Sequence, residues 1–402
     1  MKIPFSPPHI DDKIIDEVVE TLRSGWITTG PRTKLFEQRL AEYCGCRRVV
    51  CLNSATAGLE MVLRWFGVGT GDEVILPAYT YTATASAVIH CGARPVMVDV
   101  NDDFLMNAEN VRKVVTPKTK VIIPVDFAGL PCDYDSLYEI VNDPGVRELF
   151  VPASEVQEQL GRILILSDAA HSLGATYNGM KTGAIADMTV FSFHAVKNLT
   201  TAEGGAVCIN LPGDFDCDEV YRQLCVGSLH GQSKDALAKT QAGGWRYDVT
   251  FPGYKCNMTD IAAAMGLVEL ERYDSLILPR RKEIFDRYSR AFEKDQRFLI
   301  PEYETENKRS SYHVFALRIK DADEITRDRA IQMMAEKGIA TNVHFIPLPM
   351  LSAYKNMGYN IEDFSNAYRL FSGEVSLPVY FTLSNEQVDA VIRELKNSVI
   401  AP

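Results

Sequence analysis

Lys197 lies in the stretch FSFHAVKNLTTAEGGAV, residues 191–207, between an aromatic, strand-like run and a pair of glycines. A lysine amine can act as a nucleophile or a base when its surroundings remove its proton. Taken alone, such a lysine is more often a solvated surface residue. Gly204 and Gly205 would let the chain turn closely past the amine, which favours a chemical role.

Asp168 ends the apolar run RILILSD, so a parallel sheet would place its carboxylate at the carboxyl end of a strand, where ligands bind. Capping of a following helix is the ordinary role for such an aspartate. The spacing from Asp168 to Lys197 leaves room for one return through the sheet, so both side chains can reach one ligand. Pyridoxal phosphate needs such a pair, because its aldehyde bonds to a lysine amine and its ring nitrogen is kept protonated by a carboxylate.

A third segment suits the phosphate of such a ligand. In VVCLNSATAGLEMVL, an apolar strand leads through small residues into a helix. Ala55 and Thr56 would lie at the helix N-terminus, where free backbone N–H groups bind anions, although many helices simply begin with Ser or Thr caps. Ser192 is a further candidate phosphate donor. Tyr81 could stack on a ring, although a core tyrosine is the usual interpretation.

Short β-rich runs alternate with helical patterns along the chain. The runs are EVILP (73–77), PVMVDV (95–100), KVIIPV (120–125), RILILSD (162–168), MTVFSF (188–193) and GAVCI (205–209). This alternation predicts an α/β domain with a mostly parallel sheet, whose ligands gather at the carboxyl ends of the strands. Further on, YHVFALRI predicts a strand, and Ser384 with Gln387 at capping-box spacing predicts a terminal helix.

The domain boundary is expected near residue 275. A long, partly charged helical pattern over 259–295 is interrupted by Pro279, which cannot continue a helix without a break. Residues 1–275 would form a large domain, and residues 276–402 a smaller α+β domain. An amphipathic helix near the N-terminus can pack on the smaller domain.

The composition excludes several classes of protein. A chain of 402 residues with 46% hydrophobic and 24% charged residues is typical of a globular protein large enough for two domains. Its formal charge of −11 provides no basic footprint for nucleic acid. Nine cysteines without metal-ligand spacing indicate reduced thiols, and no run has the length of a signal peptide core or a membrane span. We therefore expect a cytoplasmic protein without a metal site, a nucleic-acid partner or a membrane anchor.

Five segments occur in a recognisable order: SGWITTGPRT, NSATAGLEM, SDAAHSLGA, FSFHAVKNLTTAEGG and PGYKCNMTDIAAA. With them, essentially the whole chain resembles the DegT/DnrJ/EryC1/StrS family of nucleotide-sugar aminotransferases. The resemblance implies the type I, aspartate aminotransferase-like fold and pyridoxal 5'-phosphate as cofactor. The chain is most similar to the branch that aminates C4 of UDP-linked keto sugars, as in the synthesis of UDP-4-amino-4-deoxy-L-arabinose.

The resemblance implies a role for each matching residue. Lys197 would hold the cofactor as a Schiff base and then move the proton between the substrate Cα and the cofactor C4′. Asp168 would pair with the pyridine nitrogen, and Tyr81 and His171 would contact the ring. The phosphate would be held by Ala55, Thr56 and Ser192, with Lys255 and Asn257 reaching it from the other subunit of a homodimer. The sugar would contact Trp26, Thr28, His194 and His344, for each of which a core or capping role is an equal alternative.

Three features depart from the family pattern. Asp126 stands where many relatives carry histidine, and the loop GYKCN, residues 253–257, differs from the commoner version with asparagine and arginine. Residues 140–160 are longer than the usual connection. The first two departures bear on the sugar and phosphate contacts rather than on Lys197 and Asp168, and the extra length over 140–160 has no functional account from the sequence.

The activity implied by the resemblance is a ping-pong transamination, in which L-glutamate leaves as 2-oxoglutarate and a nucleotide-linked keto sugar then receives the nitrogen at C4. Amination at C3, or of a dTDP- or GDP-linked sugar, is the alternative within the activity. Sugar dehydratases of the same family carry histidine in place of the Schiff-base lysine, so Lys197 favours amino transfer. A non-catalytic ligand-binding or regulatory protein that has kept the fold is the alternative from another class.

Overall fold

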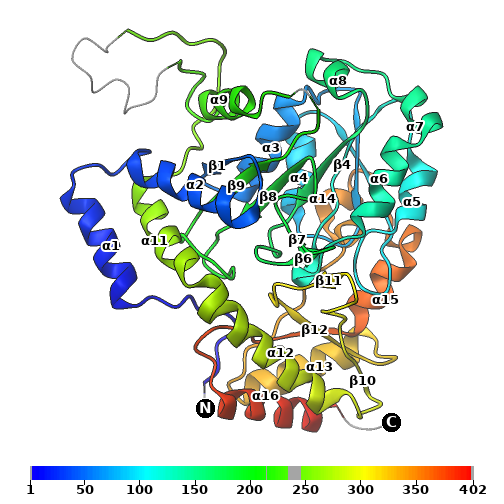
Figure 1. Cartoon of the computed structure of the whole chain (residues 1–402). Coiled ribbons are helices and arrows are strands. Elements are labelled where there is room, and N and C mark those ends of the chain that lie inside the picture. The colour runs from blue at the N-terminus through cyan, green and yellow to red at the C-terminus, as the bar shows by residue number, and fades with distance from the viewer. Residues whose placement is uncertain (1, 214, 234–245, 400–402) are drawn as a thin grey trace.

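A seven-stranded mixed sheet forms the centre of the computed structural model, which describes residues 2–213, 215–233 and 246–399 (Figure 1). Its strands, in spatial order, are β1 (Arg48–Leu52), β9 (Gly205–Ile209), β8 (Met188–Ser192), β5 (Leu164–Asp168), β4 (Thr119–Ile122), β2 (Glu73–Pro77) and β3 (Arg94–Val98). Only β9 runs antiparallel to its neighbours in this sheet. The predicted α/β fold with a mostly parallel sheet is confirmed.

Helices cover both faces of this sheet, because its strands are apolar on both sides. Val50 and Leu52 of β1 belong to the same hydrophobic core as the apolar residues of α3 (Ala55–Trp65). Val49 and Cys51 point to the other face, into a core with residues of α2 (Pro31–Cys44) and α11 (Asp260–Glu271). Strands buried on both faces show continuous apolar runs rather than alternation, as the sequence does here.

The other α-helices that the structure describes before residue 275 connect or flank these strands. They are α1 (Asp12–Arg23), α4 (Thr82–His90), α5 (Ala108–Val114), α6 (Tyr134–Asn142), α7 (Pro144–Leu149), α8 (Glu155–Leu160) and α9 (Cys217–Gly227). The short strands β6 (Thr176–Tyr177) and β7 (Met180–Lys181) form a second small sheet with β11 (Lys308–Arg309). Through this small sheet, the part of the chain that builds the large sheet pairs with the chain beyond residue 300.

A separate hydrophobic core lies in the C-terminal part of the chain, at the bottom of Figure 1. It is built by the sheet of β10 (Phe298–Leu299), β12 (Phe315–Ile319) and β13 (Glu374–Leu377), with α12 (Leu278–Phe292), α13 (Glu324–Glu336) and α16 (Asn385–Ser398). The helices α14 (Ser352–Lys355) and α15 (Ser365–Gly373) instead contribute Tyr354, Leu370 and Phe371 to the core of the large sheet. The division into two domains near residue 275 stays a prediction.

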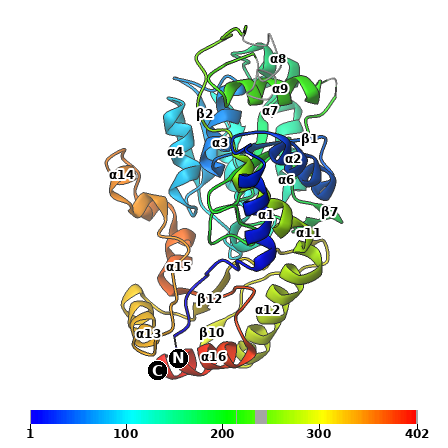
Figure 2. The same ribbon diagram turned by 90° about the vertical axis from the view of Figure 1, so that its left-hand side faces the viewer.

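The junction between α11 and α12 differs from the predicted break at Pro279. A π-helical turn, Tyr273–Ile277, joins the two helices, and Pro279 already lies in the first turn of α12. Proline is tolerated there because the amide it lacks has no partner inside the helix. The N-terminal helix α1 lies along α11 rather than on the smaller domain, whereas Ile3 ahead of it is buried in the C-terminal core and pairs with Ile339 (Figure 2).

The terminal helix and the strand before it follow the sequence prediction closely. Ser384 caps α16 by accepting from the amide of Gln387, whose side chain accepts from the amide of Ser384. The predicted strand over 312–319 begins only at Phe315, because Tyr312 has a positive φ of 57° and the amide of His313 donates to Ala128. Residues 312–314 therefore lie outside the strand, and the bond to Ala128 holds His313 toward the large sheet.

The long connection over 140–160 has a structural role. It forms α7 and α8, and Ser154 caps α8. The buried side chain of Gln157 donates to the carbonyl of Phe66, 2.9 Å away, and the Ser154 hydroxyl donates to the same oxygen. This connection therefore provides hydrogen-bond donors to the Phe66 carbonyl at the C-terminal end of α3, and not to a group at the carboxyl ends of the strands.

A buried ion pair ties β5 to the segment before β8. The two terminal guanidinium nitrogens of Arg162, Nη1 and Nη2, donate to the carboxylate of Asp187 at 2.8 and 2.7 Å. We expect Arg162→Met to lower the free energy of unfolding by about 3–5 kcal/mol, because it leaves a buried carboxylate without its cation. Urea unfolding measures this change. Arg39→Met, which breaks the exposed pair with Glu42, is the control and should cost less than about 1 kcal/mol; equal costs for the two variants would contradict the prediction.

Among the described residues, the structure has no helix that combines the length and the apolar character needed to cross a membrane. Within the same ranges, no group of three or more acidic, histidine or cysteine side chains is arranged to hold a metal ion. The described cysteines form no disulfide, and most of their side chains are buried.

Candidate active site

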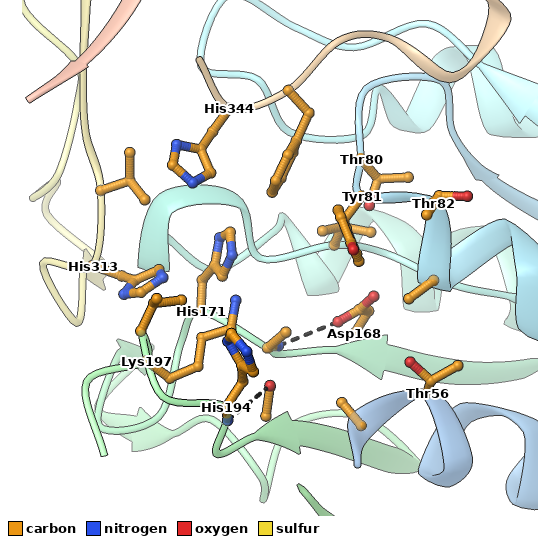
Figure 3. A pocket seen from close by; sticks show the side chains of 18 of the residues that line it. Thr56, Thr80, Tyr81, Thr82, Asp168, His171, His194, Lys197, His313 and His344 are labelled. Carbon is orange, nitrogen blue, oxygen red and sulfur yellow. Dashed lines mark hydrogen bonds between the residues drawn. The ribbon is translucent and has the colours of Figure 1, made fainter. Parts of the chain in front are cut away.

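A cavity of about 650 Å³ opens at the carboxyl ends of β5 and β8 (Figure 3). Lys197 and Asp168 both line it, on segments that follow or end neighbouring strands. The other predicted site residues that line it are Ala55, Thr56, Tyr81, His171, Ser192, His194 and His344. Folding thus brings nine of the thirteen predicted site residues to one cavity.

Asp168 is buried, and its carboxylate is held by two donors. The Thr84 hydroxyl donates to Oδ2 at 2.7 Å, and the amide of Ala170 donates to Oδ1 at 3.2 Å. Burial raises the pKa of this carboxyl, while the two hydrogen bonds and the charge of Lys197 oppose the rise. The residues after it form turns rather than a helix, so Asp168 is not a helix cap. Its fixed carboxylate can face a protonated ring nitrogen in the cavity.

Lys197 is half-buried, with its side chain directed into the cavity beside His171 (Figure 3). Burial lowers the pKa of its amine to about 8, although the charge of Asp168 opposes this shift. An exposed lysine has a pKa near 10.4, so the neutral amine is far more abundant here than on a surface. The environment of Lys197 therefore favours a nucleophile or a base over a solvated cation.

The start of α3 lies at the same cavity. The Ser54 hydroxyl caps the helix by accepting from the amide of Ala57, at 3.1 Å. The amides of Ala55 and Thr56 precede that bond, in the first turn, where backbone donors have no partner within the helix. Together with the Thr56 and Ser192 hydroxyls they can bind a phosphate, which the positive end of the helix dipole also favours.

Three histidines form one wall above Lys197 (Figure 3). His171 accepts from the amide of Ala128 through Nδ1, and its ring centroid lies 4.4 Å from that of His313. His313 bonds through Nδ1 to the Asn198 side chain at 2.7 Å. Burial lowers the pKa of both rings well below its usual value, so they add no positive charge beside the amine. His344 completes this wall from the C-terminal part of the chain.

The donor set fits pyridoxal phosphate. An amine with a lowered pKa, an anchored carboxylate and an anion-binding helix start come from three separate segments and face one cavity. The first can bond to an aldehyde, the second can pair with a pyridinium nitrogen, and the third can bind a phosphate.

Comparison with known proteins agrees with this geometry. The sequence model of the DegT/DnrJ/EryC1/StrS aminotransferase family matches residues 8–396. The chain belongs to this family. It is a pyridoxal-phosphate-dependent aminotransferase with the fold that the family resemblance implied.

Several relatives are similar over nearly their whole length. The Streptococcus pneumoniae protein Spr1654, assigned as a sugar aminotransferase, is 51% identical in its PMP form, with 99% of each chain covered and a TM-score of 0.95. Helicobacter pylori PseC, an aminotransferase of pseudoaminic acid biosynthesis, is 26% identical, with 99% of each chain covered and a TM-score of 0.85. The Bacillus subtilis spore coat polysaccharide biosynthesis protein SpsC is 37% identical, over 99% of this chain and 97% of its own.

Gly205 allows α3 of this aminotransferase to approach the sheet. It pairs with Leu52 and Ser192 across the strands, and a Cβ placed on it would lie 2.5 Å from the amide nitrogen of Ala55. We expect Gly205→Ala to weaken binding of pyridoxal phosphate about tenfold or more, because a backbone atom must move and such overpacking costs about 1–3 kcal/mol.

A fluorescence titration of the cofactor-free protein with pyridoxal phosphate measures this effect. Gly69→Ala is the matched control, because a Cβ at Gly69 would meet nothing within 4 Å. Unchanged cofactor affinity in a folded Gly205→Ala variant would show that the start of α3 does not hold the phosphate.

Four predicted site residues lie outside the cavity of this single chain: Trp26, Thr28, Lys255 and Asn257. They occupy two neighbouring segments that contact each other. The Asn257 side chain donates to the Thr29 hydroxyl, and the Lys255 amine donates to the Asn257 side chain. The Trp26 indole donates to the carbonyl of Thr29 within its own turn. Thr28 and Lys255 are exposed.

Asp126, the departure from the family's histidine, does not line the cavity. It is buried behind it and accepts from the Cys132 amide, the Tyr134 hydroxyl and the Ser172 hydroxyl. Burial raises the pKa of its carboxyl to about 6. Asp126 therefore fastens the segment that follows β4, and its effect on the sugar site is indirect.

Sequence reasoning missed Thr84, His313 and Phe345. Thr84 supports Asp168 from the first turn of α4, and nothing in TYTATAS distinguishes it from its neighbours. His313 lines the cavity from a segment that was interpreted only as a strand, and Phe345 lines it next to His344, which was predicted without it. A histidine beside a predicted strand carries no signal of its own, because its contact with His171 joins residues far apart in the chain.

Proposed function

We propose that this aminotransferase moves the amino group of L-glutamate to the C4 keto carbon of a nucleotide-linked sugar, with UDP as the nucleotide. The observation that carries the amino transfer is the convergence of Lys197, Asp168 and the start of α3 on one cavity. The sugar is supported by Spr1654 and PseC, which are described as a sugar aminotransferase and a pseudoaminic acid enzyme. The name of SpsC supports a place in polysaccharide biosynthesis, which would occur in the cytoplasm.

The residues of the chain would divide the work between them. Bound pyridoxal phosphate supplies an electron sink that stabilises negative charge at the carbon next to the nitrogen. The Lys197 amine would move the proton at that carbon, since its lowered pKa leaves it able to accept and return a proton near neutral pH. Asp168 would hold the ring nitrogen in its protonated form, and Thr84 would keep the carboxylate in place.

Ala55, Thr56 and Ser192 would bind the phosphate, and Tyr81 and His171 would contact the ring from the cavity wall. His194 and His344 would contact the sugar. His194 lies at the cavity beside Glu203, with 3.7 Å between Nε2 and the carboxylate. This exposed pair can offer both a donor and an acceptor to sugar hydroxyls.

The remaining predicted residues would act from the other subunit of a homodimer. Trp26, Thr28, Lys255 and Asn257 lie outside the cavity of their own chain, so a partner's copy of this surface is needed to bring them to the site. Large apolar side chains are exposed on these segments and on the preceding helix α1: Ile15, Leu22, Ile27, Phe251 and Tyr254. Exposed apolar side chains near these residues support an interface there.

A panel of keto sugars tests the proposal. The holoenzyme is incubated with L-glutamate and, separately, with 4-keto and 3-keto sugars linked to UDP, dTDP or GDP, and the amino sugar and 2-oxoglutarate are quantified. We expect product from a UDP-linked 4-keto sugar, with one 2-oxoglutarate released for each amino sugar formed.

Each of the other possible results of the sugar panel supports a different activity. Product only from a 3-keto sugar, or only from a dTDP or GDP sugar, would replace the proposed position or nucleotide. Loss of a sugar hydroxyl without release of 2-oxoglutarate would indicate a dehydratase. Absence of the first half-reaction, with glutamate leaving the cofactor unchanged, would favour a ligand-binding protein or another amino donor.

A further inference from the structure

Glu374 has a carboxyl group that takes no part in the proposed transamination, although it is hydrogen-bonded to His344, which lines the cavity. It begins β13 and is completely buried. Its Oε2 accepts from the backbone amide of His344 at 3.0 Å, and its Oε1 lies 2.5 Å from the Ser376 hydroxyl. The same hydroxyl lies 2.8 Å from Nδ1 of His344. Hydrogen bonds thus connect the side chains of Glu374, Ser376 and His344, from a buried carboxyl group to a ring that lines the active-site cavity.

The Ser376 hydroxyl has a single proton, so it can donate to only one of its two neighbours. When it donates to a Glu374 carboxylate, it must accept from Nδ1–H of His344, and Nε2 of the ring is an acceptor. When Glu374 is protonated, its O–H donates to Ser376 and the hydroxyl donates to Nδ1, so the ring proton lies on Nε2. Among the described residues Nε2 of His344 has no hydrogen-bond partner, and the ring lines the cavity.

We propose that Glu374 is a positioning residue that, through Ser376, decides whether His344 presents a hydrogen-bond donor or an acceptor to the substrate. The inference rests on the proposed function, in which His344 contacts the sugar. In the protonated state of Glu374, His344 donates from Nε2 and selects a substrate oxygen that accepts, such as a keto or hydroxyl oxygen. In the ionised state, the same ring favours a substrate hydroxyl or amine that donates.

Burial is the main influence on the protonation states of Glu374 and His344, and the neighbouring charges modify it. Groups around Glu374 and His344 come from several elements: Arg327 of α13, Arg318 of β12, Tyr79 after β2, Lys197, His171 and His313. Burial raises the pKa of Glu374 to about 8, with Arg327 and the two hydrogen bonds opposing the rise. Burial and the charge of Lys197 lower the pKa of His344 to about 3. At neutral pH both groups are therefore uncharged, and His344 is a donor.

Nitrogen NMR of the holoenzyme with ¹⁵N-labelled histidine tests the proposal, because imidazole nitrogens with and without a proton resonate far apart. The His344 signals are identified by their loss in His344→Gln. We expect the proton to lie on Nε2 at pH 7 and to move to Nδ1 as the pH rises through about 8, where Glu374 ionises. Glu374→Gln keeps the shape and the donor to Ser376, so its His344 should carry the Nε2 proton at every pH.

Ser376→Ala is the second variant, since it breaks the chain but keeps Glu374. Its His344 tautomer should no longer follow pH. A wild-type tautomer that does not change with pH, or a change that persists in Glu374→Gln or Ser376→Ala, would overturn the proposal. The spectra need no turnover, so they test Glu374 even if the sugar panel refutes the proposed substrate. With an accepted keto sugar, KM should rise more steeply above pH 8 in the wild type than in Glu374→Gln, because Lys197 titrates in both proteins and Glu374 only in the wild type.

Discussion

Replacing Lys197 with alanine is expected to lower turnover of glutamate by at least about 10⁴-fold, because the variant loses both the amine that bonds to the cofactor and the group that moves the proton. The first half-reaction can be followed by the visible absorption of the bound cofactor before and after glutamate. Lys197→Ala should still bind pyridoxal phosphate through Asp168 and the start of α3, but without the absorption of the lysine-bound form.

Two further variants sharpen this experiment. Lys197→Arg keeps the positive charge but cannot supply a neutral amine, so it should be as inactive as Lys197→Ala. Lys294→Ala removes an exposed lysine and should leave turnover unchanged. Turnover of Lys197→Ala within tenfold of the wild type would exclude Lys197 as the catalytic amine.

The pH dependence of cofactor capture gives an independent check on Lys197. The pKa of its amine is lowered to about 8, so the neutral form predominates above that pH and the ammonium form below it. The rate at which the cofactor-free protein binds pyridoxal phosphate covalently should therefore rise through pH 8 and level off. A midpoint near 10, the value of an exposed lysine, would show that burial does not act on this amine.

Replacing Asp168 with asparagine is expected to lower turnover by about 10- to 10³-fold. A carboxylate shifts the pKa of an opposite charge nearby by about one to three units, and each unit is worth about 1.4 kcal/mol of preference for the protonated ring. The amide can still accept from Ala170 and bond to Thr84, so the variant should fold and bind the cofactor. Steady-state kinetics with glutamate measures the loss.

Asp168→Asn should also lower the midpoint of cofactor capture, since the charge of Asp168 raises the pKa of Lys197. Thr84→Val is the matched control, because it removes one hydrogen bond and keeps the carboxylate. Its loss of turnover should be about tenfold, since one hydrogen bond to a charged group is worth about 1.5 kcal/mol at the lower end of its range. A larger loss in Thr84→Val than in Asp168→Asn would mean that placement of the carboxylate matters more than its charge.

Local signals allowed much of the fold to be predicted. Apolar runs marked β2 and β9 with their full bounds, since strands buried on both faces consist mostly of apolar residues. The capping box at Ser384 marked the start of α16, because its two hydrogen bonds join residues three apart. The break near Pro279 was placed a few residues late, because proline also fits the first turn of a helix.

Part of the candidate site could likewise be predicted from the sequence, and part could not. By itself, the sequence determined Lys197 and Asp168 as a pair and the helix start at Ala55, because strand ends of a parallel sheet meet at one edge. Only the tertiary structure decided that Asp126 lies behind the cavity, that Thr84 supports Asp168, and that Glu374 reaches His344 through Ser376. Those contacts join residues distant in the chain, and burial, which sets the pKa values of Lys197 and Glu374, is a property of the packed fold and not of any short segment.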